Sequence, residues 1–403
     1  MRFFYLENNE IQFKAYAFGM KIISIDKCKL LSSIDSFKWN SLVKAIKNDT
    51  RPVILWFDHC LSGGTEVYSQ RELNERRKNS NIIRIRSNSA GNFYLTLITN
   101  QRNNYFRIKK YDLLRTILNS IQIEEVVINN LVGYSNSLLI LKLIIDLPIP
   151  SSRITINIHD FYCICSNYNL IGNDQTFCNL KFENCKQCVR IANTNISPFQ
   201  WREYWNKFLC EYCSEIRVFS SSSADIIKRT FPLASNKIII IPHYVPELRK
   251  ARIAAHDKLN IAVLGNIGAV HKGRNIVIKL AKYLENHSDI KLHCFGEFDS
   301  KYKDSIINNI IITGAYKVDD LPDLCEKFFI DIILIPSIWP ETFSYTTSEA
   351  IMTGLPVASF NFGAQAEKVN QYNKGLILLQ QDPADIIKQI KNHLNQLKSP
   401  NKN

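Results

Sequence analysis

The chain has 403 residues, 46% of them hydrophobic, which is enough for the cores of two domains of ordinary size. Its formal charge is +13, and residues 1–250 carry 33 Lys and Arg against 21 Asp and Glu, whereas the remainder is nearly balanced. No apolar stretch approaches the ~18 residues of a membrane-spanning helix, and acidic residues stand where a signal peptide has its apolar segment, so we expect a cytoplasmic protein.

The basic excess in the first part of the chain favours an anionic partner, which is phosphate, nucleic acid or an anionic membrane surface. A basic surface with no dedicated partner explains the same count. The densest basic segment that contains aromatic residues, Arg102 to Lys110, matches no nucleic-acid-binding module. The sequence therefore does not favour RNA or DNA binding. It leaves peripheral binding to the inner face of the cytoplasmic membrane open.

Residues 1–50 form an N-terminal extension with one amphipathic segment, Phe37 to Ile46. Its apolar residues recur with the spacing of a helix, and its lysines fall on other faces. A helix that packs on the first domain and a helix that lies on a membrane surface both have this pattern. We expect the packed arrangement.

From residue 51 to 245, strand-like and helix-like segments alternate, which predicts an α/β domain with a doubly wound parallel sheet. The expected strands are Pro52–Phe57, Ile82–Arg86, Tyr94–Thr99, Glu125–Ile128, Ile154–Ile158, Arg217–Ser220 and Lys237–Ile241. The expected helices are the segment that ends near Lys78, Leu113–Ile121, Ser135–Ile145 and Trp201–Cys213.

Two of these strands lead into residues suited to ligand binding. The first strand is followed by Gly63 and Gly64, where the backbone can approach a ligand closely, although any tight turn would use the same residues. The strand that ends at Ile158 leads to His159, at the carboxyl edge of the sheet, where ligands of α/β folds bind. A structural histidine bonded to a loop carbonyl has the same sequence pattern.

A cysteine-rich insertion spans residues 163–188. Cytosolic thiols are usually reduced, so a local cluster favours a metal over disulfides, and two of the thiols have the two-residue separation that tetrahedral zinc favours. We predict a structural zinc that holds this loop in place. The predicted ligands are Cys165, Cys178, Cys185 and Cys188. Cys163 is the alternative to Cys165, and the pair Cys210 and Cys213 either packs in a helix core or replaces members of this set.

Residues 246–260 are polar and basic and are expected to link the first domain to a second one at residues 261–384. The second domain opens with a strand, Ile261 to Leu264, followed by glycines, Asn266 and Lys272. A strand that leads through glycines into a helix is an arrangement that binds anions. Residues 385–403 are expected to form a C-terminal helix that crosses back to the first domain, and a tail.

The most informative stretch runs from residue 333 to 367 and predicts a strand, a loop, a helix and a second strand. Thr346 and Glu349 have capping-box spacing, so the helix is expected to begin near Thr346. The amides of Phe343 and Ser344 would then lie at the positive end of the helix, which suits a phosphate. Glu341 and Glu349 add acceptors for sugar and ribose hydroxyls. A capping Glu349 and a solvated Glu341 are the alternative interpretation.

This stretch resembles the E-x7-E signature of glycosyltransferase family 4, which contains retaining enzymes of the GT-B fold. The segments that match are Pro340–Ser344, Glu349–Val357, Phe362–Ala364 and Glu367. The resemblance covers roughly residues 52 to 397. It implies two Rossmann-like domains that face a cleft, with the acceptor domain first and the nucleotide-sugar domain second.

The resemblance also implies roles for particular residues. It makes Glu341 the contact of the donor sugar, Glu349 that of the ribose, and Lys272 a clamp on the diphosphate. Asn266 stands where the family usually has an arginine, and His271 or Arg274 is expected to compensate. His159 is expected to reach the donor sugar, and Gly64 to face the diphosphate and the acceptor. Ser344 replaces the usual glycine but keeps the amide.

We therefore predict a retaining glycosyltransferase that moves a hexosyl or deoxyhexosyl group from a nucleotide-sugar to a growing bacterial surface glycan, of lipopolysaccharide O-antigen or capsule type. The acceptor would be a glycan or lipid-linked oligosaccharide, and no catalytic metal is expected. The alternatives are an inactive GT-B partner subunit that binds nucleotide-sugars, a nucleotide-sugar epimerase or hydrolase, and a zinc-stabilised nucleic-acid binder. The sequence does not indicate the donor sugar, the nucleotide base, the acceptor, the linkage or the oligomeric state.

Overall fold

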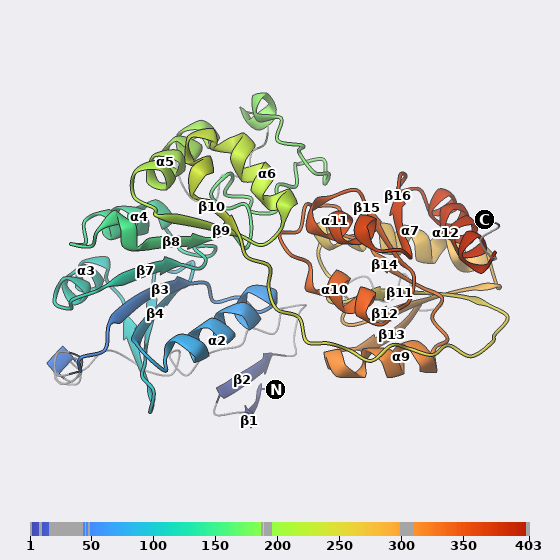
Figure 1. Cartoon of the computed structure of the whole chain (residues 1–403), viewed down its shortest axis with the longest axis horizontal. Coiled ribbons are helices and arrows are strands. Elements are labelled where there is room, and N and C mark those ends of the chain that lie inside the picture. The colour runs from blue at the N-terminus through green and yellow to red at the C-terminus, as the bar shows by residue number, and fades with distance from the viewer. Residues whose placement is uncertain are drawn as a thin grey trace. The chain divides into compact units, whose positions relative to one another are not determined.

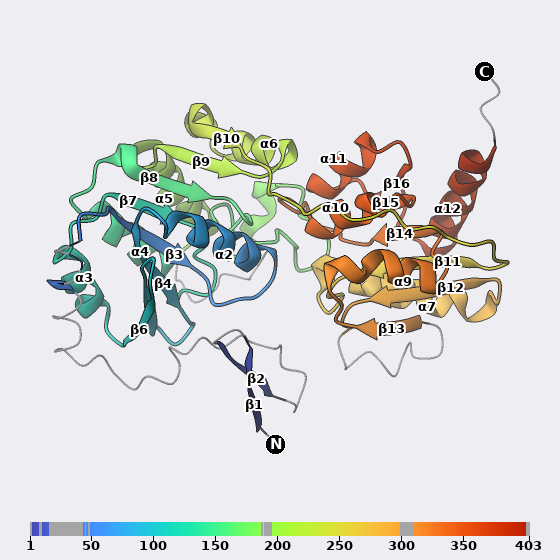
Figure 2. The same cartoon turned by 60° about the horizontal axis from the view of Figure 1, so that its bottom comes forward.

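The computed structural model describes residues 2–7, 10–15, 43, 44, 46, 49–186, 188, 196–298 and 310–399. It divides into two compact units (Figures 1 and 2). The first comprises residues 1–168, 189–219 and 224–241, and the second comprises residues 169–188, 220–223 and 242–403. Most of the helix expected at Phe37 to Ile46 lies outside the described residues. Near the N-terminus, β1 (Arg2–Glu7) and β2 (Glu10–Ala15) form an antiparallel pair.

The first unit is built on an eight-stranded sheet with the order β10-β9-β8-β7-β3-β4-β5-β6. Its strands are β3 (Val53–Asp58), β4 (Asn81–Ser87), β5 (Phe93–Ile98), β6 (Asn103–Ile108), β7 (Glu125–Ile128), β8 (Ile154–Asn157), β9 (Glu215–Val218) and β10 (Ile238–Ile240). Every pair is parallel except β4 with β5 and β5 with β6. The central strands are apolar runs because both faces of a parallel sheet are covered by helices.

The helices of the first unit include most of those expected from the sequence. They are α2 (Gly64–Arg76), α3 (Tyr111–Asn119), α4 (Ser137–Ile145), α5 (Pro198–Glu211) and α6 (Ser221–Thr230), of which residues 224–230 belong to this unit. Short 3-10 helices are η2 (Ser151–Arg153) and η4 (Pro232–Lys237). The helix α5 begins with a capping box between Ser197 and Gln200, followed by Pro198 in the first turn.

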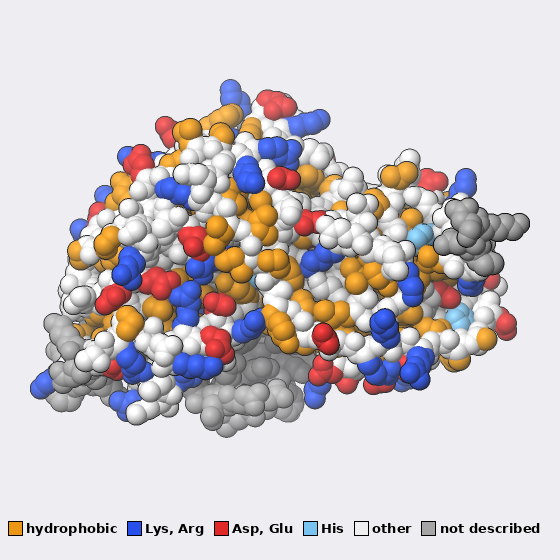
Figure 3. All heavy atoms as spheres, in the orientation of Figure 1, with side chains coloured by type: hydrophobic (Ala, Val, Ile, Leu, Met, Phe, Trp, Pro, Cys, Tyr) orange, Lys and Arg blue, Asp and Glu red, His pale blue; other side chains and the backbone are white. Residues whose placement is uncertain are grey.

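The antiparallel edge of the first sheet was not predicted. The segment interpreted from sequence as a basic cluster, Arg102 to Lys110, contains the edge strand β6. Its buried residues, Phe106 and Ile108, alternate with polar ones, as is usual for a strand with one solvated face. On the face shown in Figure 3, the Lys and Arg side chains are interspersed with Asp and Glu.

The second unit contains a six-stranded parallel sheet with the order β13-β12-β11-β14-β15-β16. Its strands are β11 (Leu259–Leu264), β12 (Ile290–Phe295), β13 (Ile310–Gly314), β14 (Ile332–Ile335), β15 (Val357–Phe360) and β16 (Gly375–Leu378). Its helices are α7 (Arg274–Tyr283), α9 (Leu321–Lys327), α10 (Tyr345–Met352), α11 (Gly363–Gln371) and α12 (Pro383–Lys398), with the 3-10 helices η3 (Phe182–Lys186), η5 (Val270–Lys272), η6 (Leu284–Asn286) and η7 (Val318–Asp320).

Each sheet reverses its winding at one strand. In the second unit β11 pairs with both β12 and β14, and in the first unit β3 pairs with both β4 and β7. This arrangement opens a crevice at the carboxyl ends of the strands, where doubly wound sheets bind ligands. The residues that follow β3, β7, β11 and β14 are therefore the ones to inspect for a site.

The start of α10 differs from the expectation. The helix begins at Tyr345, and its N-cap is Ser344, which has a left-handed backbone with φ 60°. The N-cap makes no side-chain hydrogen bond to the helix backbone, so the predicted capping box of Thr346 and Glu349 is wrong. The helix ends at Met352, before Gly354, as expected.

No described helix is long and apolar enough to cross a membrane.

A glycine sets the spacing between η5 and the loop after β14. Gly273 has φ +84°, and a Cβ at this position would lie 2.0 Å from the carbonyl oxygen of Pro336. Gly273→Ala should therefore reduce the free energy of unfolding by about 2 kcal/mol or more, measured by urea denaturation.

The matched control for this variant is Gly314→Ala. Gly314 has a similar φ of +80°, and nothing lies within 4 Å of its Cβ position, so only backbone strain of about 1 kcal/mol is expected. Equal losses in the two variants would contradict the close approach of Gly273 to Pro336.

Candidate active site

Glu341 lies in the loop between β14 and α10 and is a buried, ionised carboxylate. Its Oε1 is 2.7 Å from Nζ of Lys272 and accepts a hydrogen bond of 2.5 Å from Ser337 Oγ. Burial by itself raises the pKa of Glu341, but Lys272 and the hydroxyl groups around it outweigh burial and lower the pKa to about 2. The carboxylate is therefore charged at neutral pH.

The amide of Gln365, on α11, holds the backbone on both sides of Glu341. Its Oε1 accepts from the backbone N–H of Glu341 at 3.1 Å, and its Nε2 donates to the carbonyl of Trp339 at 2.7 Å. Gln365 is fully buried, so these bonds are not exchanged with water. The loop that carries Glu341 is thus fixed by a neighbouring helix.

Lys272 is the last residue of η5 and pairs with Glu341, so the structure brings these two predicted site residues together. Its Nζ also lies 5.9 Å from the ring centroid of Trp339. The preceding residue, His271, has Nδ1 at 3.0 Å from Nδ2 of Asn169, and its carbonyl accepts from the N–H of Ile338 at 3.0 Å. The lysine is therefore held between two anchored segments of the second unit.

Asn266 binds its own loop, because its Oδ1 accepts from the N–H of Gly268 at 2.9 Å. Nη1 of Arg274 donates to the carbonyl of Gly268 at 3.2 Å, so a guanidinium lies at the loop in which Asn266 replaces the expected arginine. Compensation by His271 or Arg274 stays a prediction.

The start of α10 lies against the end of β11. A Cβ on Gly265 would be 3.3 Å from the Thr346 methyl group, which places the two segments in contact. Ser344 Oγ shares a 2.7 Å hydrogen bond with Thr347 Oγ1, and both side chains are buried. The first amides of a helix have no partner within it, so this end of α10 is suited to an anion.

Glu349, on α10, is also buried but has the opposite protonation preference from Glu341. Burial raises its pKa to about 7, and Lys368 counteracts only part of that shift. The same burial lowers the pKa of Lys368 to about 8 against the opposing charges of Glu341, Glu367 and Glu349. Both groups therefore titrate close to neutral pH.

Lys368, on α11, was not predicted as part of the site. Its Nζ donates to Ser348 Oγ at 2.6 Å and to the carbonyl of Ser344 at 3.3 Å, and it lies 3.4 Å from the ring centroid of Phe343. Phe343 itself is buried, and its ring is tilted against that of His243 with centroids 4.6 Å apart. The sequence offered one sign of its role, because Lys368 directly follows Glu367, which belongs to the stretch that resembles the family. A lysine in a helix normally indicates a solvated face, so the sequence alone did not single it out.

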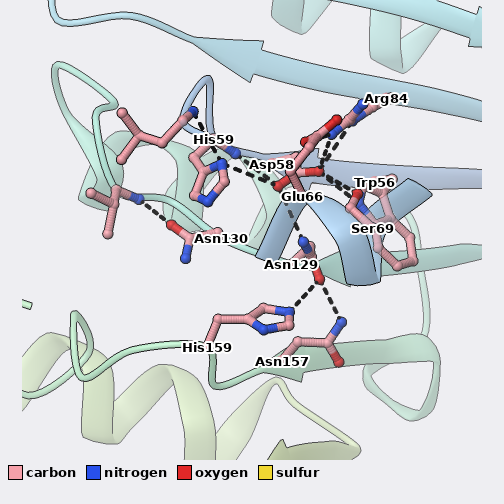
Figure 4. Close-up of polar contacts among 12 residues, drawn as sticks. Trp56, Asp58, His59, Glu66, Ser69, Arg84, Asn129, Asn130, Asn157 and His159 are labelled. Carbon is pink, nitrogen blue, oxygen red and sulfur yellow. Dashed lines mark hydrogen bonds and ion pairs between the residues drawn. The ribbon is translucent and has the colours of Figure 1, made fainter. Parts of the chain in front are cut away.

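In the first unit, His159 is buried and follows β8 after one intervening residue, Ile158. Its Nε2 lies 2.9 Å from Oδ1 of Asn129 (Figure 4). Its ring stacks on Phe219 with centroids 4.5 Å apart. Gly64 begins α2 and is exposed, preceded by Gly63 with φ 113° and no atom within 4 Å of its Cβ position. His159 therefore lies just past the carboxyl end of β8, and Gly64 lies where the turn after β3 enters α2.

The predicted zinc ligands are divided between the two units. Cys165 belongs to the first unit, whereas Cys178, Cys185 and Cys188 belong to the second. Burial raises the pKa of the Cys178 thiol, with smaller contributions from Cys185 and Cys188, which are its neighbours. Within the described parts of the chain, no group of three or more His, Cys, Asp or Glu is arranged to hold a metal ion. The zinc site stays a prediction.

Comparison with known proteins gives one family match within the chain and a set of structures with a similar fold. Residues 245–402 match the family of glycosyl transferases group 1. No curated protein sequence matches the chain.

Several solved structures are similar to the chain. The catalytic domain of starch synthase IV from Arabidopsis thaliana, bound to ADP and acarbose, is 11% identical with TM-score 0.52 and covers 88% of this chain and 93% of its own. Sucrose-phosphate synthase from Thermosynechococcus elongatus is 13% identical with TM-score 0.54, and the match covers 86% of this chain and 90% of that chain. HepE from Anabaena, in complex with UDP and glucose, is 12% identical with TM-score 0.51, and the match covers 86% of this chain and 91% of that chain. These similarities show that the chain has the GT-B fold.

The pKa of Glu349 predicts how stability depends on pH. Because the folded-state pKa of about 7 lies above the ordinary 4.5, the stabilisation of the protonated form is complete below pH 4.5 and is lost as the pH rises through 7. Relative to Glu349→Gln, the wild-type protein should lose on the order of 3 kcal/mol of unfolding free energy between pH 4.5 and 7.5. Urea denaturation at several pH values measures this difference.

Lys368→Met provides the check on the cause. Removing the cation should move the pKa of Glu349 further upward, so that the loss of stability extends to higher pH and becomes larger. A stability difference between wild type and Glu349→Gln that is constant with pH would contradict a buried, protonated Glu349.

Proposed function

We propose that this protein is a retaining glycosyltransferase that transfers a sugar from a nucleotide-sugar donor to a growing bacterial surface glycan. The observation that carries the proposal is the pairing of Lys272 with the buried Glu341 beside the start of α10. This arrangement combines a cation, a fixed carboxylate and a helix N-terminus at the carboxyl end of a parallel sheet. The match to glycosyl transferases group 1 over residues 245–402 supports it.

The donor diphosphate would bind at the start of α10, where the amides near Phe343 and Ser344 and the charge of Lys272 face an anion together. Transfer leaves additional negative charge on the diphosphate as the bond to the sugar breaks. Fixed donors stabilise that charge without reorganising, which is the main electrostatic contribution expected of such a site. ADP and UDP occur in the structures of starch synthase IV and HepE, and we extend this ligand class to the present chain.

Glu341 would accept hydrogen bonds from hydroxyl groups of the donor sugar. A carboxylate with a pKa of about 2 is a permanent acceptor at neutral pH, which suits orientation better than proton transfer. Glu349 would contact the ribose, and His159 of the first unit would orient the sugar after domain closure. We expect the acceptor hydroxyl to attack the face that the diphosphate leaves, which accounts for retention.

Gly64 would lie beside the diphosphate and the acceptor. We propose that the acceptor is a glycan or a lipid-linked oligosaccharide at the inner face of the cytoplasmic membrane.

A structural zinc on Cys165, Cys178, Cys185 and Cys188 remains part of the proposal. Metal analysis of the purified protein should find about one equivalent of zinc, and a value well below that would remove it.

One observation favours a second candidate function. Asn266 stands in place of an arginine and is bound to its own loop, so a GT-B subunit that binds the donor without turnover would have the same residue. Donor binding without transfer to any acceptor would support this candidate. Consumption of the donor without an acceptor would instead indicate an epimerase or hydrolase.

The proposal is tested by donor binding and then by transfer. The melting temperature should rise with one series among UDP-, GDP-, dTDP-, ADP- and CMP-sugars, since a ligand at ~100 times its Kd adds about 2.7 kcal/mol. With that donor, Glu341→Gln should reduce kcat at least ~100-fold while the protein remains folded, because the neutral amide loses both the pairing with Lys272 and the charged acceptor.

The exposed Glu297 of the same unit gives the control, and Glu297→Gln should transfer as the wild type does. Near-normal turnover by Glu341→Gln would refute its role. If no nucleotide-sugar raises the melting temperature, the central proposal fails.

A further inference from the structure

The first unit buries an ion pair at the end of β3 that the proposed function does not use. Asp58 is the last residue of β3, and its Oδ2 is 2.7 Å from Nη2 and 3.1 Å from Nε of Arg84 on β4. The Asp58 side chain is inaccessible to solvent, and that of Arg84 is 4% exposed. Replacing a buried ion pair with apolar residues of similar size often leaves a protein equally stable. Stability alone therefore does not explain why this pair is buried, and a functional role is the alternative.

Asp58 collects hydrogen bonds from several elements, as Figure 4 shows. Its Oδ1 accepts from the backbone N–H of His59 at 2.9 Å and from Nδ2 of Asn129 at 3.1 Å. Its Oδ2 accepts from Ser69 Oγ at 2.5 Å as well as from Arg84. Burial alone raises the pKa of Asp58, but the neighbouring positive charge and these donors hold it below the ordinary value. The carboxylate is therefore ionised and acts only as an acceptor.

The ionised Asp58 determines how the amide of Asn129 is turned. Only the NH2 group of Asn129 is compatible with a carboxylate oxygen at 3.1 Å, because the opposite orientation would bring two acceptors together. The carbonyl oxygen of Asn129 must then face the other way. There it lies 2.9 Å from Nδ2 of Asn157 and 2.9 Å from Nε2 of His159.

The orientation of Asn129 in turn assigns the proton of His159. Since Oδ1 of Asn129 is an acceptor, Nε2 of His159 must carry the hydrogen, which makes Nδ1 the unprotonated nitrogen of the neutral ring. The ring plane is held by Phe219, with an interplanar angle of 24°, and by the edge of Tyr68, whose centroid is 4.8 Å away. Packing thus fixes where the ring lies, and the amide fixes which nitrogen is protonated.

The same ion pair also reaches the first turn of α2. Nη2 of Arg84 is 2.5 Å from Oε2 of Glu66, and Ser69, which donates to Asp58, is one turn further along that helix. Glu66 follows Gly63 and Gly64 closely, so Arg84 joins the glycine turn to the chain of bonds that ends at His159. One buried charge pair therefore connects two segments that the proposed function places at the substrate.

We propose that Asp58 and Asn129 are positioning residues that fix His159 in its Nε2–H tautomer. The relay runs from Arg84 through Asp58 and Asn129 to the imidazole. The role of His159 toward the donor sugar rests on the proposed function, whereas the tautomer follows from the contacts within the first unit. Neither Asp58 nor Asn129 touches the substrate in this proposal.

Nitrogen NMR measures the tautomer directly and does not depend on activity. The protein contains eight histidines, so samples labelled with 15N-histidine give a tractable spectrum, in which His159→Gln identifies the signal of His159. In wild-type protein at pH 8, His159 should show the Nε2–H pattern. Asn129→Leu removes the acceptor at similar side-chain volume, and His159 should then populate both tautomers.

Two further variants distinguish positioning from loss of stability. Asn81 is a buried asparagine at the other end of the sheet, where it accepts from Arg51, and Asn81→Ala should leave the tautomer of His159 unchanged. Asp58→Asn keeps the shape of the side chain at position 58 but allows either orientation of the Asn129 amide. His159 should therefore populate both tautomers in this variant as well. If Asn129→Leu does not fold, as shown by circular dichroism, Asp58→Asn decides the question.

The proposal is overturned if wild-type His159 carries its proton on Nδ1, or if the folded Asn129→Leu or Asp58→Asn protein keeps the wild-type tautomer. In a transfer assay, Asn129→Leu should lower kcat at least tenfold and leave KM for the nucleotide donor within twofold, because Lys272 and Glu349 of the second unit are intact. A fall in transfer that Asn81→Ala reproduces would make the effect merely structural. An Nε2–H signal in a protein that binds no nucleotide-sugar would refute the proposed function and leave the relay standing.

Discussion

The buried charge of Glu341 is the constraint on which the rest of the candidate site in the second unit depends. A carboxylate removed from water is costly unless it is paired and hydrogen-bonded, and here Lys272 and Ser337 provide both. Gly273 directly follows Lys272, and its lack of a side chain lets η5 approach Pro336 in the loop that carries Glu341. The backbone geometry and the electrostatics of the loop therefore require each other.

Three buried carboxylates show how environment decides protonation. Asp58 is fully enclosed but receives a guanidinium and several donors, so it stays ionised, and Glu341 is ionised for the same reason. Glu349 is nearly as buried, yet among the described residues only Lys368 lowers its pKa, which burial raises to about 7. Burial acts in the same direction on all three, and the number of donors close to each carboxylate determines the result.

Sequence patterns predicted what depends on neighbours along the chain. The apolar runs at β14 and β15 and the position of Glu341 between them followed from residues that are adjacent in sequence. The GT-B fold was predicted from the resemblance. The antiparallel strand β6 was missed because its polar positions look like a solvated loop. The capping box failed because Ser344 takes a left-handed backbone instead, which the spacing of Thr346 and Glu349 does not reveal. The position of His159 after a strand was predictable from the sequence. Which of its ring nitrogens carries the proton was not, because in our proposal this depends on Asp58, which is distant in sequence.

The difference in pKa between Glu341 and the pair Glu349 and Lys368 also affects how the proposed donor site would respond to its ligand. Lys368 and Glu349 both have pKa values near neutral pH, so their charges respond to whatever binds beside them. A diphosphate at the start of α10 would add negative charge there, which favours protonated Glu349 and protonated Lys368. Binding would then take up protons at neutral pH, whereas Glu341, with its pKa of about 2, would remain ionised. The residue proposed to orient the sugar thus keeps its charge as the pH changes, whereas the residues proposed to lie beside the ribose and the phosphate do not.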